Sequence, residues 1–481
     1  MWHEEIVPDE WPKGIITIVP KKGDTSVCSN NRGITLRATS SKLFQVIMLN
    51  RVSSCIEQLL RENQCGFRRN RSTVDQLFSL QMIIRKFVDY NLPMKINFID
   101  FRAAFDCIDR NYIWTAFEHY GMPVKYIRIF KAFYHNTMSA VRVNGELTDW
   151  FSVSSGTGQG DIQAPTIFGV VINWGLEMAM NSKSVSNGLV LQKRLSSRTP
   201  QFAITDFDYA DDLSVLDDTE EGLQETTDLI THHCGKAGLT VNAKKTKVMS
   251  TSKYHLQRPY PEDHTLNITA NGIECAQESY FTYLGTVISS DGSIDREIST
   301  RIGKASGAMN LLNNVWRNRS ITTSTKIRLY TATVITVLTH GCAAWTTTAD
   351  DMHRLEVFHQ RCIRRILRIR WFDLISNSET LSRANSGTIK TIISEKRLRW
   401  YGHVTRMPPE RYPAYILDWT PKHGHRSQGA PRRTWTQCIE EDLELLTGKV
   451  GITCEQGKSL AKDRKLWRQM LKGCCGGCAA R

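Results

Sequence analysis

Tyr209–Asp212 (YADD) is the stretch that decides the fold of this 481-residue chain. Strand-like runs flank it, Ile204–Asp208 on one side and Leu213–Leu216 on the other, so the pattern predicts a strand, a two-residue turn and a second strand. At the tip of such a hairpin the carboxylates of Asp211 and Asp212 would repel each other unless a cation lay between them. The pattern therefore predicts a divalent metal site, although an Asp pair at a turn is often only solvated.

A third carboxylate has a setting that fits the same site. Lys95–Phe101 has the pattern of a buried strand, and its acidic residue, Asp100, falls at the end of the apolar run. A charge that ends a buried strand is often functional, because burying it without a partner is costly. The alternative is that Asp100 caps a helix beginning near Arg102, a role that Asp fills well. Asp106 and Asp109 are expected to have only such structural roles.

Asp100, Asp211 and Asp212 would together supply the ligands for two Mg²⁺ ions. Two-metal nucleotidyl transfer requires carboxylates from separate strands that bridge ions about 3.5–4 Å apart. The Gly-rich loop Gly156–Pro165 lies between these carboxylates in the sequence, but it lacks the Gly-Lys-Ser/Thr ending of a phosphate-binding P-loop. A P-loop nucleotide site is therefore excluded.

Seven ordered motifs resemble those of reverse transcriptases, and more narrowly the reverse transcriptases of non-long-terminal-repeat (LINE-type) retrotransposons. The resemblance covers about the first 345 residues. The palm motifs are Asp100 with Phe105, the loop Gly156–Pro165, and Tyr209–Asp212. The other matching segments are Gly14–Asp24, Asn31–Leu36, Gln64–Arg68 with Arg71–Thr73, Gly238–Lys247 and Tyr283–Gly285.

The resemblance implies roles for residues that would face the substrate. Phe105 would be the steric gate that excludes the 2′-hydroxyl group of a ribonucleotide. Gln159 and Gly160 would lie under the templating base and the incoming nucleotide, and Tyr209 would also contact the substrate. From the residues alone, Phe105 would be interpreted as an ordinary packed side chain in preference to a gate, and the Gly-rich stretch as a flexible loop.

Basic residues are expected to bind the phosphates of the substrate. Arg32, with Lys21 or Lys22, would bind the triphosphate, since a guanidinium group matches phosphate oxygens and stays charged. Lys245 would donate a proton to the departing pyrophosphate. The run Lys244–Lys247 could equally be a solvated basic surface. The implied partners are an RNA template, a DNA primer or target, and deoxynucleoside triphosphates.

The implied fold is α+β, a right-hand polymerase followed by a basic, mostly helical C-terminal region. We expect fingers over residues 1–80, a palm with finger insertions over 81–288 and a thumb over 289–345. A basic nucleic-acid-binding region is expected over 346–481. The thumb prediction rests on apolar residues spaced three and four apart on one helix face, namely Ile298, Ile302, Ala305, Met309 and Leu312.

Ser182–Pro200 is polar and serine-rich, and it precedes the YADD hairpin. Its basic residues are Lys183, Lys193 and Arg194. Such a segment is most often solvated, so we expect an exposed insertion.

Positive charge is concentrated near the C-terminus. Residues 351–481 contain 25 Lys and Arg against 13 Asp and Glu, a net +12 out of +14 for the whole chain. His359–Arg368 is predicted to be an amphipathic helix, and arginine interleaved with aromatic residues suits nucleic acid. Alternatively, Trp400 and Trp435 are core residues and the arginines a solvated rim. The candidate nucleic-acid contacts are Arg364, Arg365, Arg397, Arg399, Trp400, Arg432 and Arg433.

Composition limits the compartment of the protein and the kinds of metal site and membrane segment that it can contain. Thirteen scattered cysteines favour free thiols in a reducing compartment. The tail cluster Cys474, Cys475 and Cys478 lacks a second half-site at the spacing that zinc requires. No run of 18 apolar residues occurs, which excludes a membrane-spanning helix. A location in the nucleus and cytoplasm is expected, because a retrotransposon enzyme must reach chromosomal DNA.

The predicted function is an RNA-directed DNA polymerase with two Mg²⁺ ions. About a dozen residues precede the fingers pattern, so we expect a fragment, a truncated copy or a late start that lacks the endonuclease common ahead of such polymerases. The competing hypothesis is a catalytically inactive, truncated remnant that binds nucleic acid through its basic C-terminal half. A maturase or telomerase-like polymerase shares the palm, but the C-terminal Arg/Trp segments make it less attractive.

Overall fold

Two compact units make up the chain. The first comprises residues 1–73, 94–249 and 265–278, and the second comprises 74–93, 250–251 and 279–481. The computed structural model describes residues 1–21, 23–185, 188–193, 196, 201–251, 265–426 and 431–474. Lys22, Arg194, Cys475 and Cys478, which the sequence singled out, lie outside the described residues.

A five-stranded sheet lies at the centre of the first unit. Its strand order is β14 (Ala276–Gln277), β11 (Lys247–Ser250), β3 (Lys95–Ile99), β10 (Asp212–Asp217) and β9 (Asp206–Tyr209). β10 is antiparallel to both β3 and β9. Only Ala210 and Asp211 separate β9 from β10, so the predicted strand, two-residue turn and strand are confirmed.

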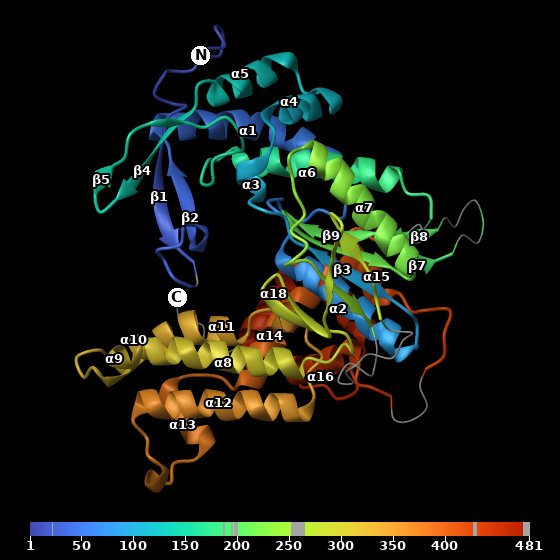
Figure 1. Ribbon diagram of the computed structural model, residues 1–481. Coiled ribbons are helices and arrows are strands. Elements are labelled where there is room, and N and C mark those ends of the chain that lie inside the picture. Colours follow the sequence, from blue (N-terminus) through green and yellow to red (C-terminus); the bar gives the residue numbers. More distant parts are fainter. Residues whose placement is uncertain are drawn as a thin grey trace. The chain divides into compact units, whose positions relative to one another are not determined.

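Helices cover this sheet and bury its apolar side chains. α7 packs on β3 and β10, α6 packs on α7, and α4 packs on α5 and α6 (Figure 1). α6 is apolar almost all round, as expected of a helix enclosed by neighbours. The helices of this unit are α1 (Thr39–Leu59), α3 (Ala104–Cys107), α4 (Arg110–His119), α5 (Val124–Tyr134), α6 (Ala164–Asn181) and α7 (Glu220–Lys236), with the short 3₁₀ helix η1 (Cys28–Asn30).

A second sheet of the first unit contains the segments expected to be fingers. Its order is β2 (Asn31–Leu36), β1 (Gly14–Pro20), β4 (Met138–Val143) and β5 (Glu146–Leu147), with β6 (Phe151–Ser152) also paired to β4. β1 runs parallel to β4, which lies within the range where finger insertions were expected. The smaller strand pairs are β7 (Leu189–Gln192) with β8 (Phe202–Ile204), and β12 (Thr269–Ala270) with β13 (Ile273–Glu274).

The expectation of an exposed insertion before the hairpin is wrong for several of its described residues. Leu189 and Leu191 of β7 are buried, because β7 pairs with β8. The Lys183 ammonium group is also enclosed and lies 3.5 Å from a carboxylate oxygen of Asp217. The prediction failed because the many serines of the segment indicate a solvated loop, whereas Leu189, Leu191 and Lys183 are enclosed by contacts with other segments.

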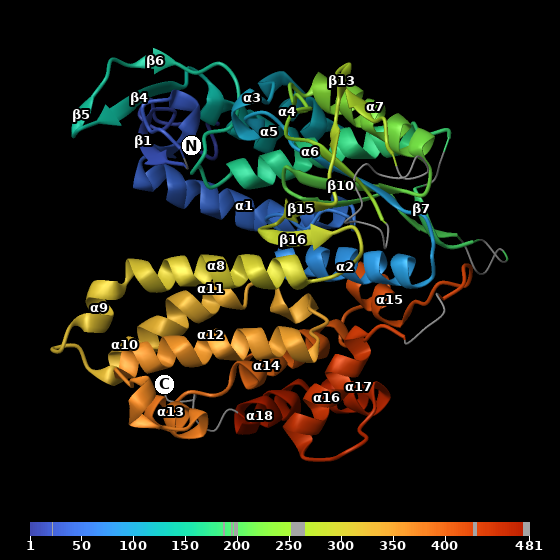
Figure 2. The same cartoon turned by 60° about the horizontal axis from the view of Figure 1, so that its bottom comes forward.

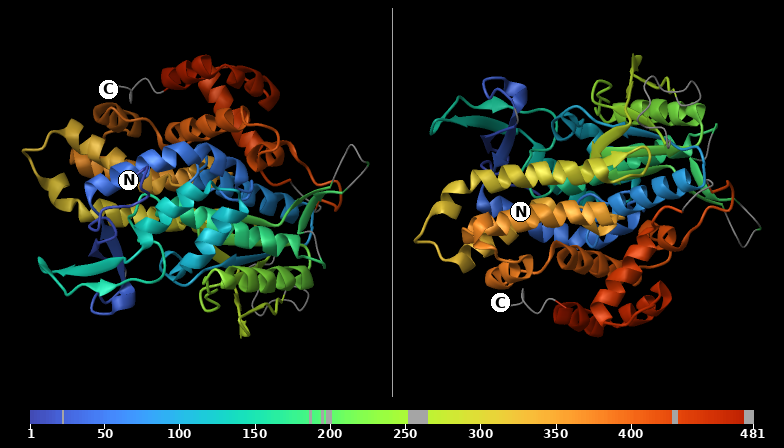
Figure 3. Two further views of the ribbon diagram at one scale, coloured as in Figure 1. Left: turned by 90° about the horizontal axis from the view of Figure 1, so that it is seen from above. Right: turned by 90° about the horizontal axis from the view of Figure 1, so that it is seen from below.

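The second unit is mainly helical and includes α2 (Thr73–Asp89), which is distant in sequence from its other helices. α8 and α12, yellow and orange in Figures 2 and 3, lie side by side. Ile298, Ala305 and Met309 are buried on one face of α8, which confirms the predicted helical spacing. The names and limits of fingers, palm, thumb and C-terminal region stay predictions.

The remaining elements of the second unit follow β15 (Tyr280–Tyr283) and β16 (Thr286–Ser289), which form a two-stranded sheet. They are α8 (Asp295–Leu311), α9 (Asn313–Arg317), α10 (Thr323–Tyr330), the π-helix η3 (Thr331–Ile335), α11 (Thr336–Leu338), η4 (Cys342–Ala344), α12 (Ala349–Leu367), η5 (Trp371–Asp373), α13 (Asn377–Ala384), α14 (Ile389–Val404), α15 (Tyr412–Asp418), α16 (Trp435–Thr447), α17 (Cys454–Lys462) and α18 (Arg464–Cys474).

Two candidate nucleic-acid residues of α14, Arg397 and Trp400, belong instead to the core of the second unit, as does Trp435 of α16. Trp400 and Trp435 are buried, with their rings 5.7 and 4.9 Å from that of Phe78. The Arg397 side chain is also buried, and it donates two hydrogen bonds to the Asp442 carboxylate at 2.6 and 3.0 Å. The expected phosphate contact by Arg397 and base stacking by Trp400 are therefore corrected, because neither side chain faces solvent.

The other candidate arginines have more open positions. Arg364 is half-buried on α12, while Arg365 is exposed there. Arg399 is exposed on α14 and pairs with Glu395. Arg432 is exposed and donates to the backbone oxygen of Asp291 at 2.8 Å, whereas Arg433 is half-buried and pairs with Glu441 at 2.5 Å. A role for these five arginines in nucleic-acid binding stays a prediction.

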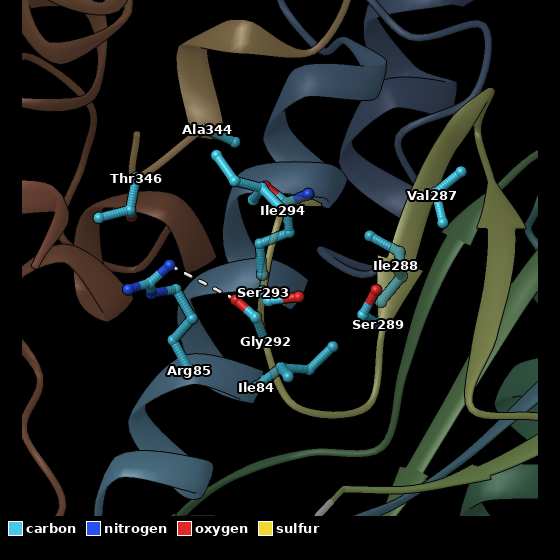
Figure 4. A pocket seen from close by; sticks show the side chains of 11 residues that line it. Ile84, Arg85, Val287, Ile288, Ser289, Gly292, Ser293, Ile294, Ala344 and Thr346 are labelled. Carbon is cyan, nitrogen blue, oxygen red and sulfur yellow. Dashed lines mark hydrogen bonds between the residues drawn. The ribbon is translucent and has the colours of Figure 1, made fainter. Parts of the chain in front are cut away.

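A small pocket lies inside the second unit, between α2 and the segment from β16 to α8 (Figure 4). Arg85 reaches into this region and donates a hydrogen bond to the backbone oxygen of Gly292 at 3.4 Å. The pocket has a volume of about 10 Å³, room for about one water molecule. In the described part of the chain, no helix is both long and apolar enough to cross a lipid bilayer.

The buried Arg397–Asp442 pair gives a test of the core of the second unit. Asp442→Ala leaves an unpaired guanidinium group in the interior, so it should lower the free energy of unfolding by about 3–5 kcal/mol. Glu395→Ala removes an acidic partner from the exposed Arg399 and should cost less than about 1 kcal/mol. Urea denaturation followed by tryptophan fluorescence measures both. Equal losses in the two variants would contradict a core role for Arg397.

Candidate active site

The register of the central sheet brings three aspartates to one end. Ile99 of β3 is opposite Leu213 of β10, so the next residue, Asp100, lies beside Asp212 across the two strands. Asp211 occupies the turn between β9 and β10. Ala210 in the same turn has a φ of +59°, which lets the chain reverse within two residues.

The three carboxylates interact electrostatically. Desolvation, followed by the negative charges of Asp211 and Asp100, raises the pKa of Asp212 to about 6. Desolvation and then the charge of Asp100 also raise the pKa of Asp211, while the positive charge of Arg32 opposes this rise. The arrangement therefore disfavours full ionisation and creates a site where a cation would be stabilised.

Asp100 is held by the segment that follows α7. The Asn242 side-chain amide donates to a carboxylate oxygen of Asp100 at 3.2 Å, and the Asn242 backbone N–H donates to the Asp100 carbonyl at 2.7 Å. The Lys245 ammonium group lies 3.7 Å from the same carboxylate. The alternative role as a helix cap does not apply, because Ala103 precedes α3 and no side chain caps that helix.

Gln64 fixes the hairpin turn and is a residue that the sequence did not single out individually. Its side-chain oxygen accepts hydrogen bonds from the backbone N–H groups of Ala210 at 2.9 Å and Gly66 at 2.6 Å. A Cβ atom on Gly66 would lie 2.3 Å from the Ala210 nitrogen, so only glycine fits there. The only sequence signal was that Gln64 belongs to a segment resembling a family motif.

A cluster of charged side chains lies along β9, the first strand of the hairpin. Arg61 pairs with both Asp206 and Asp208 of β9, at 2.7 Å in the case of Asp208. Burial, followed by the charge of Asp206, holds the pKa of Asp208 well above its usual range. For Asp206, burial acts to raise the pKa, but the charge of Arg61 and the hydrogen bonds from Asp208, Arg61 and Thr205 together outweigh it, so the pKa is lowered. In the sequence, the signal for this cluster is the alternation of Asp206 and Asp208 with aromatic residues along β9.

Phe105 lies within an aromatic row close to this site. Its ring stacks on Phe168 with the ring centres 4.4 Å apart, and it meets the exposed ring of Phe67 edge-on at 6.1 Å. The Phe105 carbonyl accepts a hydrogen bond from the Thr157 backbone N–H at 2.7 Å. Phe105 is thus packed on one side and joined to the Gly-rich loop, and its role as a gate stays a prediction.

The Gly-rich loop lies against β2, which carries Arg32. The Thr35 backbone N–H donates to the Gln159 carbonyl at 2.6 Å, and the Gln159 side chain donates to Asp106 at 3.3 Å. Gly160 has a φ of +100°, and a Cβ there would lie 3.0 Å from the Thr35 oxygen. The loop is therefore anchored to the sheet that contains β1 and β2, so it is more ordered than a freely flexible loop would be.

The basic candidates occupy different places in the first unit. Arg32 is exposed on β2, and its charge reaches Asp211. Lys21 is also exposed and lowers the pKa of Asp106, although burial outweighs this effect and the net pKa is raised. Tyr209 pairs with Asp212 at the base of the turn. Substrate binding by these residues stays a prediction.

Among the described residues, no three His, Cys, Asp or Glu side chains are already gathered at the spacing of a metal site. The chemistry of Asp100, Asp211 and Asp212 nevertheless suits a divalent ion, because carboxylate oxygens are hard ligands and their mutual repulsion favours a cation. These are the residues that would hold Mg²⁺.

Comparison with known proteins agrees with this geometry. Residues 19–288 match the family described as "Reverse transcriptase (RNA-dependent DNA polymerase)", which is more than half of the chain. The chain belongs to the reverse transcriptase family. The match begins in β1 and ends in β16, so it includes all three aspartates, Phe105 and the Gly-rich loop. The predicted family and the α+β polymerase fold are confirmed.

Relatives of this reverse transcriptase come from non-long-terminal-repeat retrotransposons. The chain is 25% identical over 247 residues to the "Retrovirus-related Pol polyprotein from type-1 retrotransposable element R2" of Popillia japonica, covering 51% of this chain and 33% of that protein. It is 23% identical over 373 residues to the "Probable RNA-directed DNA polymerase from transposon BS" of Drosophila melanogaster, covering 75% and 39%. The chain thus spans between a third and two fifths of these relatives.

A solved structure is also similar to the reverse transcriptase chain. The apo telomerase of Candida tropicalis has a TM-score of 0.41 at 11% identity, over 86% of this chain and 70% of that one.

The raised pKa of Asp212 predicts a pH-dependent stability. Between about pH 4 and 6 the folded chain binds a proton at Asp212 that the unfolded chain has lost, so this contribution disappears as the pH rises through about 6. Thermal melting without divalent ions should therefore show the wild type losing stability relative to Asp212→Asn over that range.

The effect of Mg²⁺ on the melting temperature tests whether Asp212 is a metal ligand. At pH 7 Mg²⁺ should raise the melting temperature of the wild type, and it should do so less at pH 5, where Asp212 is protonated. Asp228→Asn, at an exposed position of α7, is the matched control. A Mg²⁺ effect that survives Asp212→Asn unchanged would argue against the assigned metal ligands.

Proposed function

We propose that this chain is an RNA-directed DNA polymerase that extends a primer 3′-hydroxyl group with deoxynucleoside triphosphates. The observation that carries the proposal is the meeting of Asp100, Asp211 and Asp212 at one end of the sheet, where burial and the charge of Asp100 raise the pKa values of Asp211 and Asp212. Membership of the reverse transcriptase family supports the same reaction.

The aspartates would hold the metal ions of the reaction. Two bound Mg²⁺ ions would supply activation of the primer oxygen and charge stabilisation of the leaving pyrophosphate. Asp100 is positioned for this role by Asn242, and the turn that contains Asp211 is positioned by Gln64. Fixed ligand positions matter because small displacements of reacting groups slow such reactions strongly.

Two basic residues would act on the triphosphate. Arg32 already interacts electrostatically with Asp211, so a phosphate bound near the aspartates would lie within reach of its guanidinium group. Lys245 is exposed and next to Asp100, a position from which its ammonium group could give a proton to pyrophosphate. Both groups can act without leaving an unpaired charge in the interior.

Primer extension on an RNA template tests the proposed reaction. Asp211→Asn removes a metal ligand and should lower the rate of extension by at least about 100-fold, because loss of one charged stabilising group costs roughly 2.7–4 kcal/mol in the transition state. Asp228→Asn removes an exposed carboxylate of the same unit and should leave the rate unchanged.

The controls distinguish this reaction from the competing hypothesis. Unchanged extension after Asp211→Asn would place the chemistry elsewhere. Absence of extension by the wild type, with RNA binding intact, would favour a truncated remnant that keeps its fold and binds nucleic acid.

Sugar selection tests Phe105 separately. Phe105→Val removes the ring from its row with Phe67 and Phe168, so the space proposed to exclude a 2′-hydroxyl group should open. Incorporation of ribonucleotides relative to deoxynucleotides should rise by at least about tenfold, equivalent to about 1.4 kcal/mol of lost discrimination. Phe130→Leu, in the core away from the row, is the control for general loosening of the first unit. An unchanged ratio in Phe105→Val would contradict the gate.

A further inference from the structure

Three large apolar side chains are exposed in the connection between α12 and α13. Trp371 is 87% exposed, Leu374 is 88% exposed and Phe372 is 54% exposed. They lie within Arg368–Leu374, which we call the aromatic loop and which lies at the lower left of Figure 1. Contiguous apolar exposure of this kind usually marks a surface that another molecule covers.

Hydrogen bonds within the aromatic loop fix its shape. The Ile369 backbone N–H donates to the Arg364 carbonyl at 2.9 Å as α12 ends. The Arg370 backbone N–H donates to a carboxylate oxygen of Asp373 at 2.6 Å, and the Asp373 N–H returns to the Arg370 carbonyl at 3.1 Å. The rings of Trp371 and Phe372 meet edge-on at 5.8 Å. The rings are thus presented on a defined turn.

A basic groove adjoins the aromatic loop along α12. It has a volume of about 530 Å³ and is lined by Arg361, Arg364 and Arg365, with one carboxylate, that of Glu356, and with Ile369 of the loop and Asn377 of α13. Arg364 is oriented by hydrogen bonds to the Ile375 carbonyl at 2.7 Å and to the Asn377 side chain at 2.9 Å. The groove and the loop therefore form one continuous surface.

The arginines of this surface differ in their partners from those of α14. Within the described parts of the chain, none of the five forms an ion pair with a carboxylate, in contrast to Arg397 and Arg399 on α14. The five are Arg361, Arg364, Arg365, Arg368 and Arg370. Unpaired guanidinium groups beside exposed rings call for a ligand that carries both anionic groups and flat apolar faces.

We propose that the aromatic loop and the basic groove form a binding site for single-stranded RNA. Phosphates would lie along the arginines of the groove, and unpaired bases would stack on Trp371 and Phe372. In a duplex the bases are stacked on one another and cannot stack on Trp371 or Phe372, so the exposed rings favour binding of a single strand. RNA is chosen because it is the single-stranded nucleic acid that the proposed polymerase takes as template; in this respect the inference rests on the proposed function.

Equilibrium binding of the full chain to a 20-nucleotide polyuridine RNA tests the site. Trp371→Ala with Phe372→Ala should raise the Kd by about tenfold or more, because stacking on one aromatic ring contributes about 1–3 kcal/mol per base. Trp371→Phe should retain most of the affinity, since a flat ring remains. Binding to a blunt RNA duplex should change by less than about twofold.

Salt dependence tests the groove independently. Arg361→Gln with Arg370→Gln should reduce the slope of log Kd against log salt by about 1.4, the release expected for two phosphate contacts on a single strand. The aromatic variant should leave the slope unchanged. Lys449→Gln and Val450→Ala remove an exposed charge and an exposed apolar side chain elsewhere in the second unit, and neither should alter the Kd.

Primer extension separates this inference from the proposed function. If the wild type extends primers, the aromatic variant should raise the KM for a long single-stranded template while leaving kcat unchanged. If the wild type binds RNA through the loop but extends no primer, only the proposed function fails. Unchanged RNA affinity in the aromatic variant would overturn the proposed site. If that variant kept its RNA affinity and lost self-association, the aromatic loop would be a contact between copies of the chain.

Discussion

Repulsion between carboxylates at one end of the central sheet is the constraint on which the architecture of the candidate active site depends. Asp100 follows β3 and Asp212 begins β10, and the antiparallel register of these strands places the two residues beside each other. Asp211 adds a third negative charge in the adjoining turn. Such an arrangement is unfavourable without a counter-charge, so the surrounding backbone must hold it against the tendency of the charges to separate.

The support for this site comes from segments that are far apart in the chain. The Gln64 side chain accepts hydrogen bonds from the backbone N–H groups of Ala210 and Gly66. The Asn242 side chain donates to Asp100, and Arg61 pairs with both carboxylates of β9. The Gln64 contacts are buried, so they restrict motion more effectively than a solvated ion pair would. The first unit thereby holds two half-buried carboxylates, Asp100 and Asp211, and the exposed carboxylate of Asp212 at one end of its central sheet.

The positive charge of the second unit divides into two kinds that composition alone cannot distinguish. Arg397 is an internal structural residue, because Asp442 and the backbone satisfy its donors. The arginines around the aromatic loop have no carboxylate partner among the described residues and lie next to exposed rings. A net charge of +12 over residues 351–481 therefore gives a smaller available binding surface than the sequence suggested.

The sequence by itself determined the family, the YADD hairpin and the three aspartates, because these depend on local order and on strand patterns a few residues long. It also found the buried face of α8 from helical spacing. Only the tertiary structure decided that Arg397 and Trp400 are internal, that Lys183 is enclosed, and that Gln64 and Asn242 hold the site. The physical reason is that burial and partner choice depend on segments brought together by folding, which spacing along one segment does not record.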